Sequence, residues 1–265
     1  MLTRTPRRLL AGSLALLLVA AACGSDDESD SADTTDPTEA TTGGTDGAPE
    51  PSGETLTLGY SAWPGWFPLA VAEEAGIFED VGLDVDLRYF ADYLGSLDAM
   101  ATGQIDGNTQ TLNDTMFSVA SGSPQTIVVV NDNSTGNDAI ICDESVGDSI
   151  EDLEGKTIAA EAGVVDHFLL LQGLESVGLT EDDIDFRGAL TADAAAAFAG
   201  GEFDCVGVFA PFTLQALERP GSKVIFDSSD FPGTIPDHIV VSPELIAERP
   251  DDVQALVDAW YLTLQ

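Results

Sequence analysis

Hydrophobic and polar residues follow two different periods along the chain after residue 54. Residues 55–60 alternate polar and apolar side chains, which is typical of a half-buried strand. Residues 68–75 carry apolar side chains at helical spacing and stop at Gly76, a common residue just past a helix. Because the two periods exchange repeatedly, the sequence predicts an α/β protein.

The pattern forms two successive series. The first predicts strands over 55–60, 83–90 and 125–130 and helices over 68–75, 92–102 and 112–121, with a short strand before the last helix. The β-branched run TIVVV indicates that the strand over 125–130 is buried in a parallel sheet. The second predicts strands over 157–161, 184–187, 205–209 and 223–226 and helices over 164–177, 192–199 and 212–218, before a strand over 238–242 and a helix over 251–264.

One segment of each series has a counterpart in the other. SLDAMATGQIDGN (96–108) and AAAAFAGGEFDCV (194–206) both read as an Ala-rich helix, a Gly, an Asp and a strand, and DLR or DFR precedes each. Gly103 and Gly201 would close their helices in the left-handed conformation. Coincidence in an Ala- and Gly-rich background is the alternative.

Two lobes are therefore expected, one over 54–135 plus 239–265 and the other over 136–238. The chain would cross between them near 131–139 and 228–237.

The N-terminus has the layout of a signal peptide over 1–22, with Arg4, Arg7 and Arg8 before an apolar run. About fourteen apolar residues are too few for a membrane-spanning helix, which needs roughly twenty. The end of the run, LLLVAAACGS, resembles a bacterial lipoprotein signal, which implies lipidation of Cys23 and a location on the extracytoplasmic face of the cell membrane. The alternative is ordinary secretion, with Cys23 as a spare thiol.

Residues 24–53 contain no aromatic residue, Lys or Arg and are dense in Ser, Thr, Asp, Gly and Pro. Such a segment buries too little apolar surface to offset its ordering entropy, so residues 23–53 are expected to be a lipidated Cys followed by a disordered acidic tether.

Charge excludes one class of partner. Three of the nine Lys and Arg lie in the first eight residues, so six remain against 47 Asp and Glu. Phosphate binding needs a basic face, so no nucleic acid is expected to bind. The acidic surplus serves either solubility or a cationic partner. Cys142 and Cys205 are open to two interpretations, a disulfide or two buried reduced thiols.

Several segments in fixed order resemble a known family: GYSAWPGWFPLAVAEEAGIFEDVGLDVDL (59–87), ATGQIDGNTQT (101–111), DLEGKTIAAEAG (152–163), GGEFDCVGVFAPF (200–212) and IAERPDDVQALVDAWY (246–261). Together they are similar to the substrate-binding proteins of ABC importers for nitrate, taurine, sulfonates and thiamine pyrimidines. The resemblance implies a type II periplasmic-binding-protein fold, with two Rossmann-like lobes, a two-segment hinge and a ligand held between the lobes. It also implies an ABC permease as partner and a monomeric protein. Ala210 stands where relatives commonly carry an acidic residue, and relatives continue beyond the equivalent of Trp260.

In open α/β sheets, ligands bind outside the carboxyl ends of the strands, in loops that lead into helices. Trp63 and Trp66 lie in such a loop, and indole rings offer apolar contact and attract cations. Thr111 and Asn113 offer polar groups at a helix start, although they could equally be helix caps. The candidate ligand-binding residues are Ser61, Trp63, Trp66, Gln110, Thr111, Asn113, Asp132, Asp138, Gly163, Val164, Asp166, Phe209 and Phe212.

Acidic residues follow the predicted strands, and the six remaining basic residues lie elsewhere. An aromatic, carboxylate-lined cleft favours a small cationic or neutral nitrogen-containing ligand. A sulfonate, taurine or nitrate is the alternative, because a helix N-terminus can hold an anion without Arg.

Two other functions are disfavoured by the residues present. Catalysis needs a base beside a nucleophile, and the chain has only His167, His238 and two strand cysteines. A transition-metal site needs clustered His or Cys, and NDNSTGND (131–138) lacks the spacing of a calcium-binding loop. No cofactor and no metal are expected, and a sensor or adhesion role for the same fold stays open.

Overall fold

The computed structural model describes residues 49–265, which lie within one compact unit. The expected signal peptide, the lipidation site at Cys23 and all but the last residues of the expected tether lie outside the described residues. Within residues 49–265, no helix is both long and apolar enough to cross a membrane.

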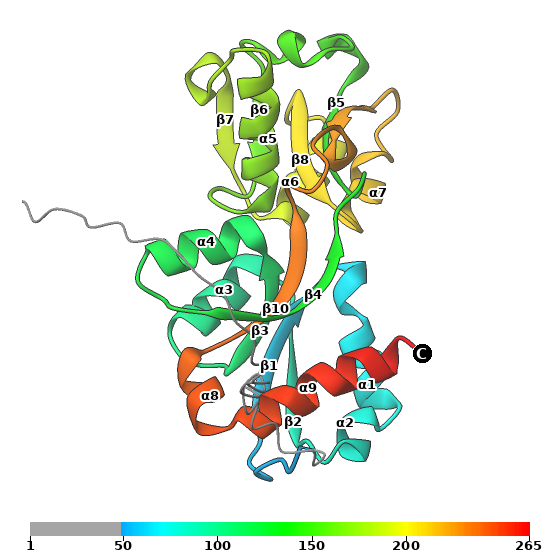
Figure 1. The fold of residues 1–265 in the computed structure, drawn as a ribbon. Coiled ribbons are helices and arrows are strands. Elements are labelled where there is room, and N and C mark those ends of the chain that lie inside the picture. The colour runs from blue at the N-terminus through cyan, green and yellow to red at the C-terminus, as the bar shows by residue number, and fades with distance from the viewer. Residues whose placement is uncertain (1–48) are drawn as a thin grey trace, which may run out of the picture. The chain divides into compact units, whose positions relative to one another are not determined.

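The first lobe is built on a five-stranded sheet with the order β2-β1-β3-β10-β4 (Figure 1). Its strands are β1 (Leu56–Ser61), β2 (Val85–Phe90), β3 (Gly107–Thr111), β4 (Thr126–Asn133) and β10 (Pro236–Val241). β1 is parallel to β2 and β3, whereas β10 runs antiparallel to β3 and β4. The last strand of the chain therefore lies inside the sheet that the first strands begin.

The second lobe has a sheet of the same design, with the order β7-β6-β8-β5-β9. Its strands are β5 (Asp138–Cys142), β6 (Thr157–Ala160), β7 (Asp185–Gly188), β8 (Cys205–Phe209) and β9 (Lys223–Asp227). β6 is parallel to β7 and β8, and β5 runs antiparallel to β8 and β9. The prediction of an α/β protein with two similar units is confirmed.

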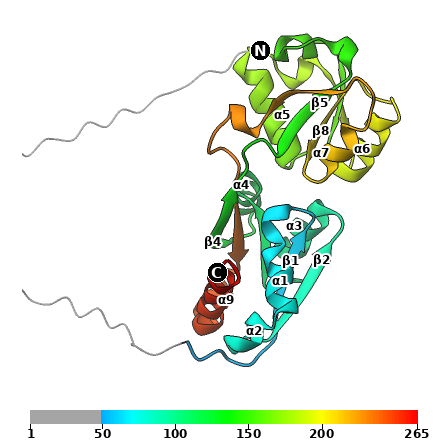
Figure 2. The ribbon, with the colours of Figure 1, turned by 90° about the vertical axis from the view of Figure 1, so that its right-hand side faces the viewer.

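Helices connect the strands in both lobes. The α-helices are α1 (Pro68–Glu74), α2 (Ile77–Asp80), α3 (Tyr93–Ala101), α4 (Leu112–Ala120), α5 (Val165–Ser176), α6 (Thr191–Ala199), α7 (Phe212–Ala216), α8 (Pro243–Glu248) and α9 (Pro250–Thr263). Short 3-10 helices are η1 (Pro64–Trp66), η2 (Glu144–Val146), η3 (Ile150–Leu153), η4 (Glu181–Asp183) and η5 (Ser228–Asp230). α9 packs against α1 and α2 (Figure 2).

The two similar sequence segments fold identically. Gly103 and Gly201 have φ angles of 68° and 85°, which confirms the left-handed helix ends. The amide after each Gly bonds to a carbonyl five residues earlier, Gln104 N to Ala99 O at 2.9 Å and Glu202 N to Ala197 O at 3.0 Å.

The Asp of each segment also has the same partner. Asp106 Oδ2 accepts from the Thr57 amide at 2.8 Å, and Asp204 Oδ2 accepts from the Thr157 amide at 2.9 Å. The repeat is therefore structural and not a coincidence of composition.

The strand over 125–130 exists, but the prediction that it is buried in a parallel sheet is wrong. β4 is an edge strand that pairs only with the antiparallel β10 among the described strands, and Ile127 and Val130 are exposed. The β-branched run reports strand propensity, but it carries no information about which strand lies beside it. Two short helices, α2 and α8, also lie outside the predicted elements.

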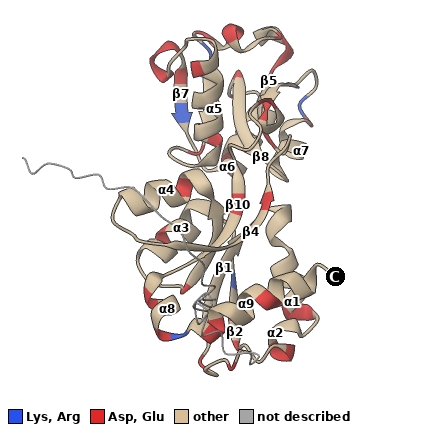
Figure 3. Cartoon of the chain, in the orientation of Figure 1, with Lys and Arg blue, Asp and Glu red and all other residues tan. Residues whose placement is uncertain are grey.

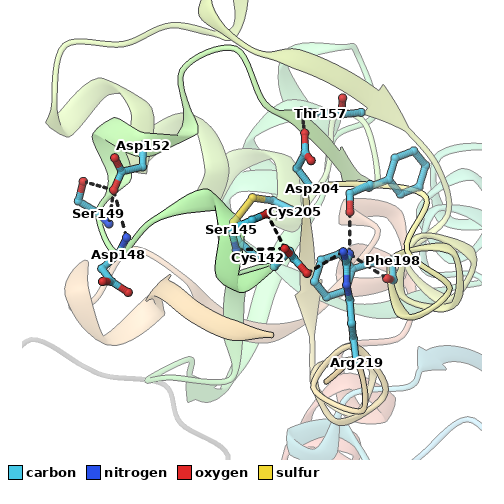
Figure 4. The surroundings of a disulfide bond; sticks show 12 residues. Cys142, Ser145, Asp148, Ser149, Asp152, Thr157, Phe198, Asp204, Cys205 and Arg219 are labelled. Carbon is cyan, nitrogen blue, oxygen red and sulfur yellow. Dashed lines mark hydrogen bonds and ion pairs between the residues drawn. A yellow bond between two sulfur atoms is a disulfide. The ribbon is translucent and has the colours of Figure 1, made fainter. Parts of the chain in front are cut away.

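The Sγ atoms of Cys142 and Cys205 are bonded in a disulfide between facing residues of β5 and β8, whose Cα atoms are 4.0 Å apart (Figure 4). Both cysteines are fully buried. Beside them, Arg219 donates hydrogen bonds to the carbonyls of Phe198 and Phe203 and pairs with Asp143 at 2.8 Å.

Two segments connect the sheets, one between β4 and β5 and the other between β9 and β10. They lie side by side. Ser134 Oγ is 2.8 Å from Ser228 Oγ, the Gly136 amide donates to Ser228 Oγ at 2.7 Å, and the Ser134 amide donates to the Ile235 carbonyl at 2.9 Å. The two lobes are therefore joined by these two backbone segments, which we call the paired crossing.

Candidate functional site

Aromatic side chains from both lobes meet in one cluster. Trp63 and Trp66 come from the turn after β1, Tyr93 begins α3, and Phe209 ends β8. The Trp63 and Phe209 ring centroids are 6.4 Å apart, and those of Tyr93 and Phe209 are 6.2 Å apart, both edge to face. All four side chains are buried. The loops at the carboxyl ends of strands in the two sheets therefore face each other through aromatic rings.

The tryptophan turn is shaped by local hydrogen bonds and one glycine. The Trp66 amide donates to the Trp63 carbonyl at 3.0 Å, and Trp63 Nε1 donates to Asp132 Oδ2 at 3.3 Å. A Cβ on Gly65 would lie 1.7 Å from Asp132 Oδ2 and 2.7 Å from Trp63 Nε1, so a larger residue here would displace this pair of side chains. Trp66 Nε1 is buried and has no hydrogen-bond partner.

Two small cavities lie against this aromatic cluster and share Tyr93 and Phe209 as a common wall. The Glu161 cavity, about 60 Å³, is lined by Ser61, Ala62, Ala91, Asp92, Tyr93, Glu161, Leu190, Thr191, Ala192, Asp193, Phe209 and Phe212. The Asp237 cavity, about 10 Å³, is lined by Trp63, Trp66, Tyr93, Thr111, Asp138, Val165, Phe209 and Asp237. Each cavity takes residues from both lobes.

Buried carboxyl groups surround the cavities. Burial raises the pKa of Asp114 and of Asp138 to about 7, even though Thr111 and Tyr93 donate to Asp114 and Ser134 donates to Asp138. The pKa of Asp166 is raised well above its usual range by burial and by neighbouring carboxylates. That of Asp237 is raised in the same way, by burial and then by the charges of Asp132 and Asp138.

Hydroxyl groups satisfy part of this carboxyl set. Thr191 Oγ1 lies 2.7 Å from Glu161 Oε2 and 2.8 Å from Asp166 Oδ2. Glu161 Oε1, Asp166 Oδ1 and Asp237 Oδ2 are buried without a hydrogen-bond partner. Burial also raises the pKa of Glu161 and of Asp132. Burial without a partner destabilises the ionised form of a carboxyl group. A hydrogen-bond donor or a positive charge in the site would stabilise it.

Lys and Arg are few in residues 49–265, and Figure 3 marks them in blue at scattered positions along the ribbon. Five of the six Lys and Arg in residues 49–265 pair with carboxylates elsewhere: Arg88 with Asp86, Arg187 with Asp185, Arg219 with Asp143, Lys223 with Asp148 and Arg249 with Asp252. None of the residues that line the two cavities is a Lys, an Arg or a His.

The structure brings together nine of the thirteen residues predicted from the sequence, seven that line the two cavities and two that contact the lining. Trp63, Trp66, Thr111, Asp138 and Phe209 line the Asp237 cavity, and Ser61, Phe209 and Phe212 line the Glu161 cavity. Asp132 and Asp166 contact this set through Trp63 and Thr191.

Four predicted residues lie elsewhere. Gly163 and Val164 line a separate cavity of about 400 Å³ beside α3 and α4. Gln110 is buried inside the first lobe, where it donates to Thr115 and Gln125, and Asn113 donates to Asp114.

Several cavity residues are absent from the prediction: Tyr93, Glu161, Thr191 and Asp237. Tyr93, Glu161 and Thr191 follow β2, β6 and β7, so the rule about carboxyl ends of strands applies to them and could have found them. Asp237 is different, because it lies at the start of an antiparallel strand opposite Thr111 and Asp132. The rule for parallel strands does not reach it.

Neither histidine lines either cavity. His167 stacks on Phe186 and lies 2.6 Å from Glu181 Oε2, and His238 Nε2 lies 2.6 Å from Thr115 Oγ1. Burial lowers the pKa of His238 to about 4. In residues 49–265, no group of three or more His, Cys, Asp or Glu side chains is placed to hold a metal ion.

The unliganded protein is expected to lose stability as the pH rises from about 5 to 8. Asp138 has a pKa of about 7 in the fold against 3.8 as a free group, so the folded state binds more protons than the unfolded state in this window. The free energy of unfolding therefore falls as the pH rises through the folded pKa. In Asp138→Asn, the difference in melting temperature between pH 5 and pH 8 should be smaller than in the wild type by several degrees.

Melting temperatures at pH 5 and pH 8 test this expectation. Asp182→Asn, at an exposed position, removes the same charge and serves as the control for general repulsion. Equal slopes for the two variants would contradict a special role of Asp138.

Comparison with known proteins shows the family and the fold. The sequence model of the NMT1-like family matches residues 48–263. A Brucella abortus protein named as a binding protein is 29% identical over 208 residues, which cover 76% of this chain and 63% of that protein. An Escherichia coli protein named for binding aliphatic sulfonates is 28% identical over 200 residues, with coverage of 74% and 62%. This chain thus spans less than two thirds of the length of these curated relatives.

Among solved structures, the alkanesulfonate-binding protein SsuA from Xanthomonas axonopodis pv. citri, bound to MOPS, has a TM-score of 0.71 at 22% identity. The match covers 79% of this chain and 72% of that chain. The two-sheet architecture is the type II periplasmic-binding-protein fold. With the family match over most of its length, the chain belongs to the NMT1-like family.

Proposed function

We propose that this protein is the solute-binding component of an ABC import system, and that it captures a small cationic or neutral nitrogen-containing organic compound between its two lobes. One observation carries the choice of ligand class: buried carboxyl groups and aromatic rings surround the two cavities, and no Lys, Arg or His lines them.

The electrostatics of the cleft favour a cation. Asp138, Glu161 and Asp237 line the cavities, and the pKa of each is raised because burial disfavours the charged form. A positive ligand group would lower these pKa values and donate hydrogen bonds to the carboxylate oxygens, whereas an anion would add to the unfavourable charge. Indole and phenol faces attract a cation by about 0.5 to 2 kcal/mol each.

Capture requires the lobes to part. Cavities of about 60 and 10 Å³ hold little more than water, and the rings of Trp63, Trp66 and Phe209 occupy the space between the lobes. The paired crossing at Ser134 and Ser228 is the segment that would bend. Ligand and aromatic rings would then share the closed cleft.

The remaining parts of the proposal follow from the sequence. Cys23 would carry a lipid that anchors the protein to the extracytoplasmic face of the cell membrane, and residues 24–53 would serve as its tether. The protein would act as a monomer without a cofactor, deliver its ligand to an ABC permease and catalyse no reaction. Its lobes would comprise 54–135 with 239–265, and 136–238.

A sulfonate, taurine or nitrate is the second candidate. Two polar groups favour it: Trp66 Nε1 and Ser61 Oγ are buried without a partner, and both can donate a hydrogen bond to an oxyanion. The names of the Escherichia coli and Xanthomonas relatives point to the same class.

Titration calorimetry separates the two classes. We expect primary amines, guanidinium compounds or aminopyrimidines to bind with micromolar or lower Kd, and taurine, alkanesulfonates and nitrate to give no heat. Asp237→Asn should weaken cation binding roughly tenfold or more, because it removes one charge-assisted contact.

The exposed Asp182→Asn is the matched control and should leave the Kd unchanged. Tight sulfonate binding together with no response to any cation would sink the proposed ligand class in favour of the second candidate.

A further inference from the structure

The cleft is divided into two acidic compartments by one aromatic wall. Tyr93 and Phe209 line both cavities, and their ring centroids are 6.2 Å apart; every other lining residue belongs to one cavity alone. A ligand that occupies both compartments must therefore pass this pair of rings.

Each compartment has its own carboxylates. The Glu161 cavity is lined by Glu161 with Asp92 and Asp193, and the Asp237 cavity by Asp237 with Asp138. Each set combines elements of both sheets: Asp92 follows β2 and Glu161 follows β6, whereas Asp237 lies in β10 and Asp138 in β5. Closing the lobes therefore brings the carboxylates of each compartment together.

Unpartnered polar atoms mark both ends as built for a ligand. At the Glu161 end, Glu161 Oε1 and Ser61 Oγ are buried with no hydrogen-bond partner, and the two residues are 3% and 2% exposed. At the other end the same holds for Asp237 Oδ2, in a residue 2% exposed. Buried polar groups are normally satisfied, so these atoms indicate contacts that an occupant of the cleft completes.

We propose that the captured compound carries two cationic nitrogen groups, one for each cavity, joined by an apolar segment that runs along the wall formed by Tyr93 and Phe209. This inference rests on the proposed function and narrows its ligand class to diamines and compounds of the same shape. One ammonium donates to Glu161 and Ser61, and the other donates to Asp237 and Asp138. The methylene segment lies against the two rings, where apolar contact replaces water.

Two positive groups on the ligand would satisfy the buried carboxyl groups at both ends of the cleft, whereas one would satisfy a single end. A single ammonium at one end leaves the buried carboxyl group at the other end, Glu161 or Asp237, without a donor. A second positive group supplies that compensation in the same binding event, without the entropy cost of holding a second molecule.

The experiment compares α,ω-diamines with n-alkylamines of equal chain length, from three to six carbons, by calorimetry on the full chain. We expect the best diamine to bind roughly 10- to 100-fold more tightly than the monoamine of the same length, because hydrogen bonds to charged groups are worth that much. Glu161→Gln and Asp237→Asn should each remove most of this advantage. The exposed Glu202→Gln is the matched control and should keep it.

The outcomes distinguish this inference from the function on which it rests. Monoamines that bind as tightly as diamines, or a diamine advantage that survives in both cavity variants, would refute the two-ended ligand while leaving a cation-binding protein. Binding of taurine or nitrate with no response to any amine would refute both. The wild-type comparison is decisive even if a variant fails to fold.

Discussion

Replacing Trp66 by alanine is expected to weaken ligand binding by about 2–4 kcal/mol, which is roughly 30- to 1000-fold in Kd. The indole lies between Trp63 and Tyr93, at centroid distances of 6.4 and 5.6 Å, and it is 3% exposed. Its removal takes away apolar contact, the attraction of a ring face for a cation and a buried N–H that has no partner. Calorimetry with the tightest compound of the amine panel gives the change in Kd.

A second substitution at Trp66 separates the contribution of the aromatic face from that of the indole N–H. Trp66→Phe keeps an aromatic face but has no N–H, so it should retain most of the affinity for a simple amine and lose affinity for a ligand that accepts a hydrogen bond there. Tyr261→Ala, an exposed aromatic truncation on α9, is the control. Unchanged binding by a folded Trp66→Ala protein would place the ligand away from the tryptophan turn.

Removal of the Cys142–Cys205 disulfide is expected to lower the free energy of unfolding by about 4 kcal/mol. The bond closes a loop with a sequence separation of 63 residues, and the chain-entropy relation assigns a loop of this length about that much stabilisation of the fold over the unfolded chain. The closed loop contains β6, α5, β7 and α6, so the loss should fall on the second lobe. Urea unfolding followed by circular dichroism measures the change.

Two samples test the disulfide from different sides. Cys142→Ala with Cys205→Ala removes the bond but also leaves small cavities in a fully buried position. The wild-type protein with its disulfide reduced keeps both side chains, so its loss isolates the cross-link. An unchanged urea midpoint after reduction would contradict the expected stabilisation.

The regular elements were predictable because their signals are local. The helix over 92–102 is marked by its apolar spacing and by Gly103, and the equivalent helix before Gly201 by the same signs. Strand neighbours were not predictable, because pairing depends on residues far apart in sequence. The β-branched run over 125–130 therefore predicts a buried strand of a parallel sheet, whereas β4 is an antiparallel edge strand.

The cleft was predictable in part for a related reason. Trp63, Thr111 and Phe209 follow strands whose carboxyl ends meet, so a rule of topology applied to local pattern finds them. Asp237 is not found by this rule because β10 runs antiparallel to β3. Its position opposite Thr111 follows only from the register of the two strands. Glu161 gave no local sign of its unpartnered oxygen, because burial is set by packing across the two lobes.

The place of β10 in the first sheet has a consequence for the order of assembly. The five strands of the second sheet come from one continuous stretch, from Asp138 to Asp227, whereas the first sheet needs β10 between β3 and β4. During synthesis the second sheet can be completed while the first sheet still lacks β10. Until β10 is made, β3 and β4 each have an unpaired edge. Those edges pair only after about residue 241 has emerged, so aggregation during synthesis or refolding should begin from the N-terminal portion.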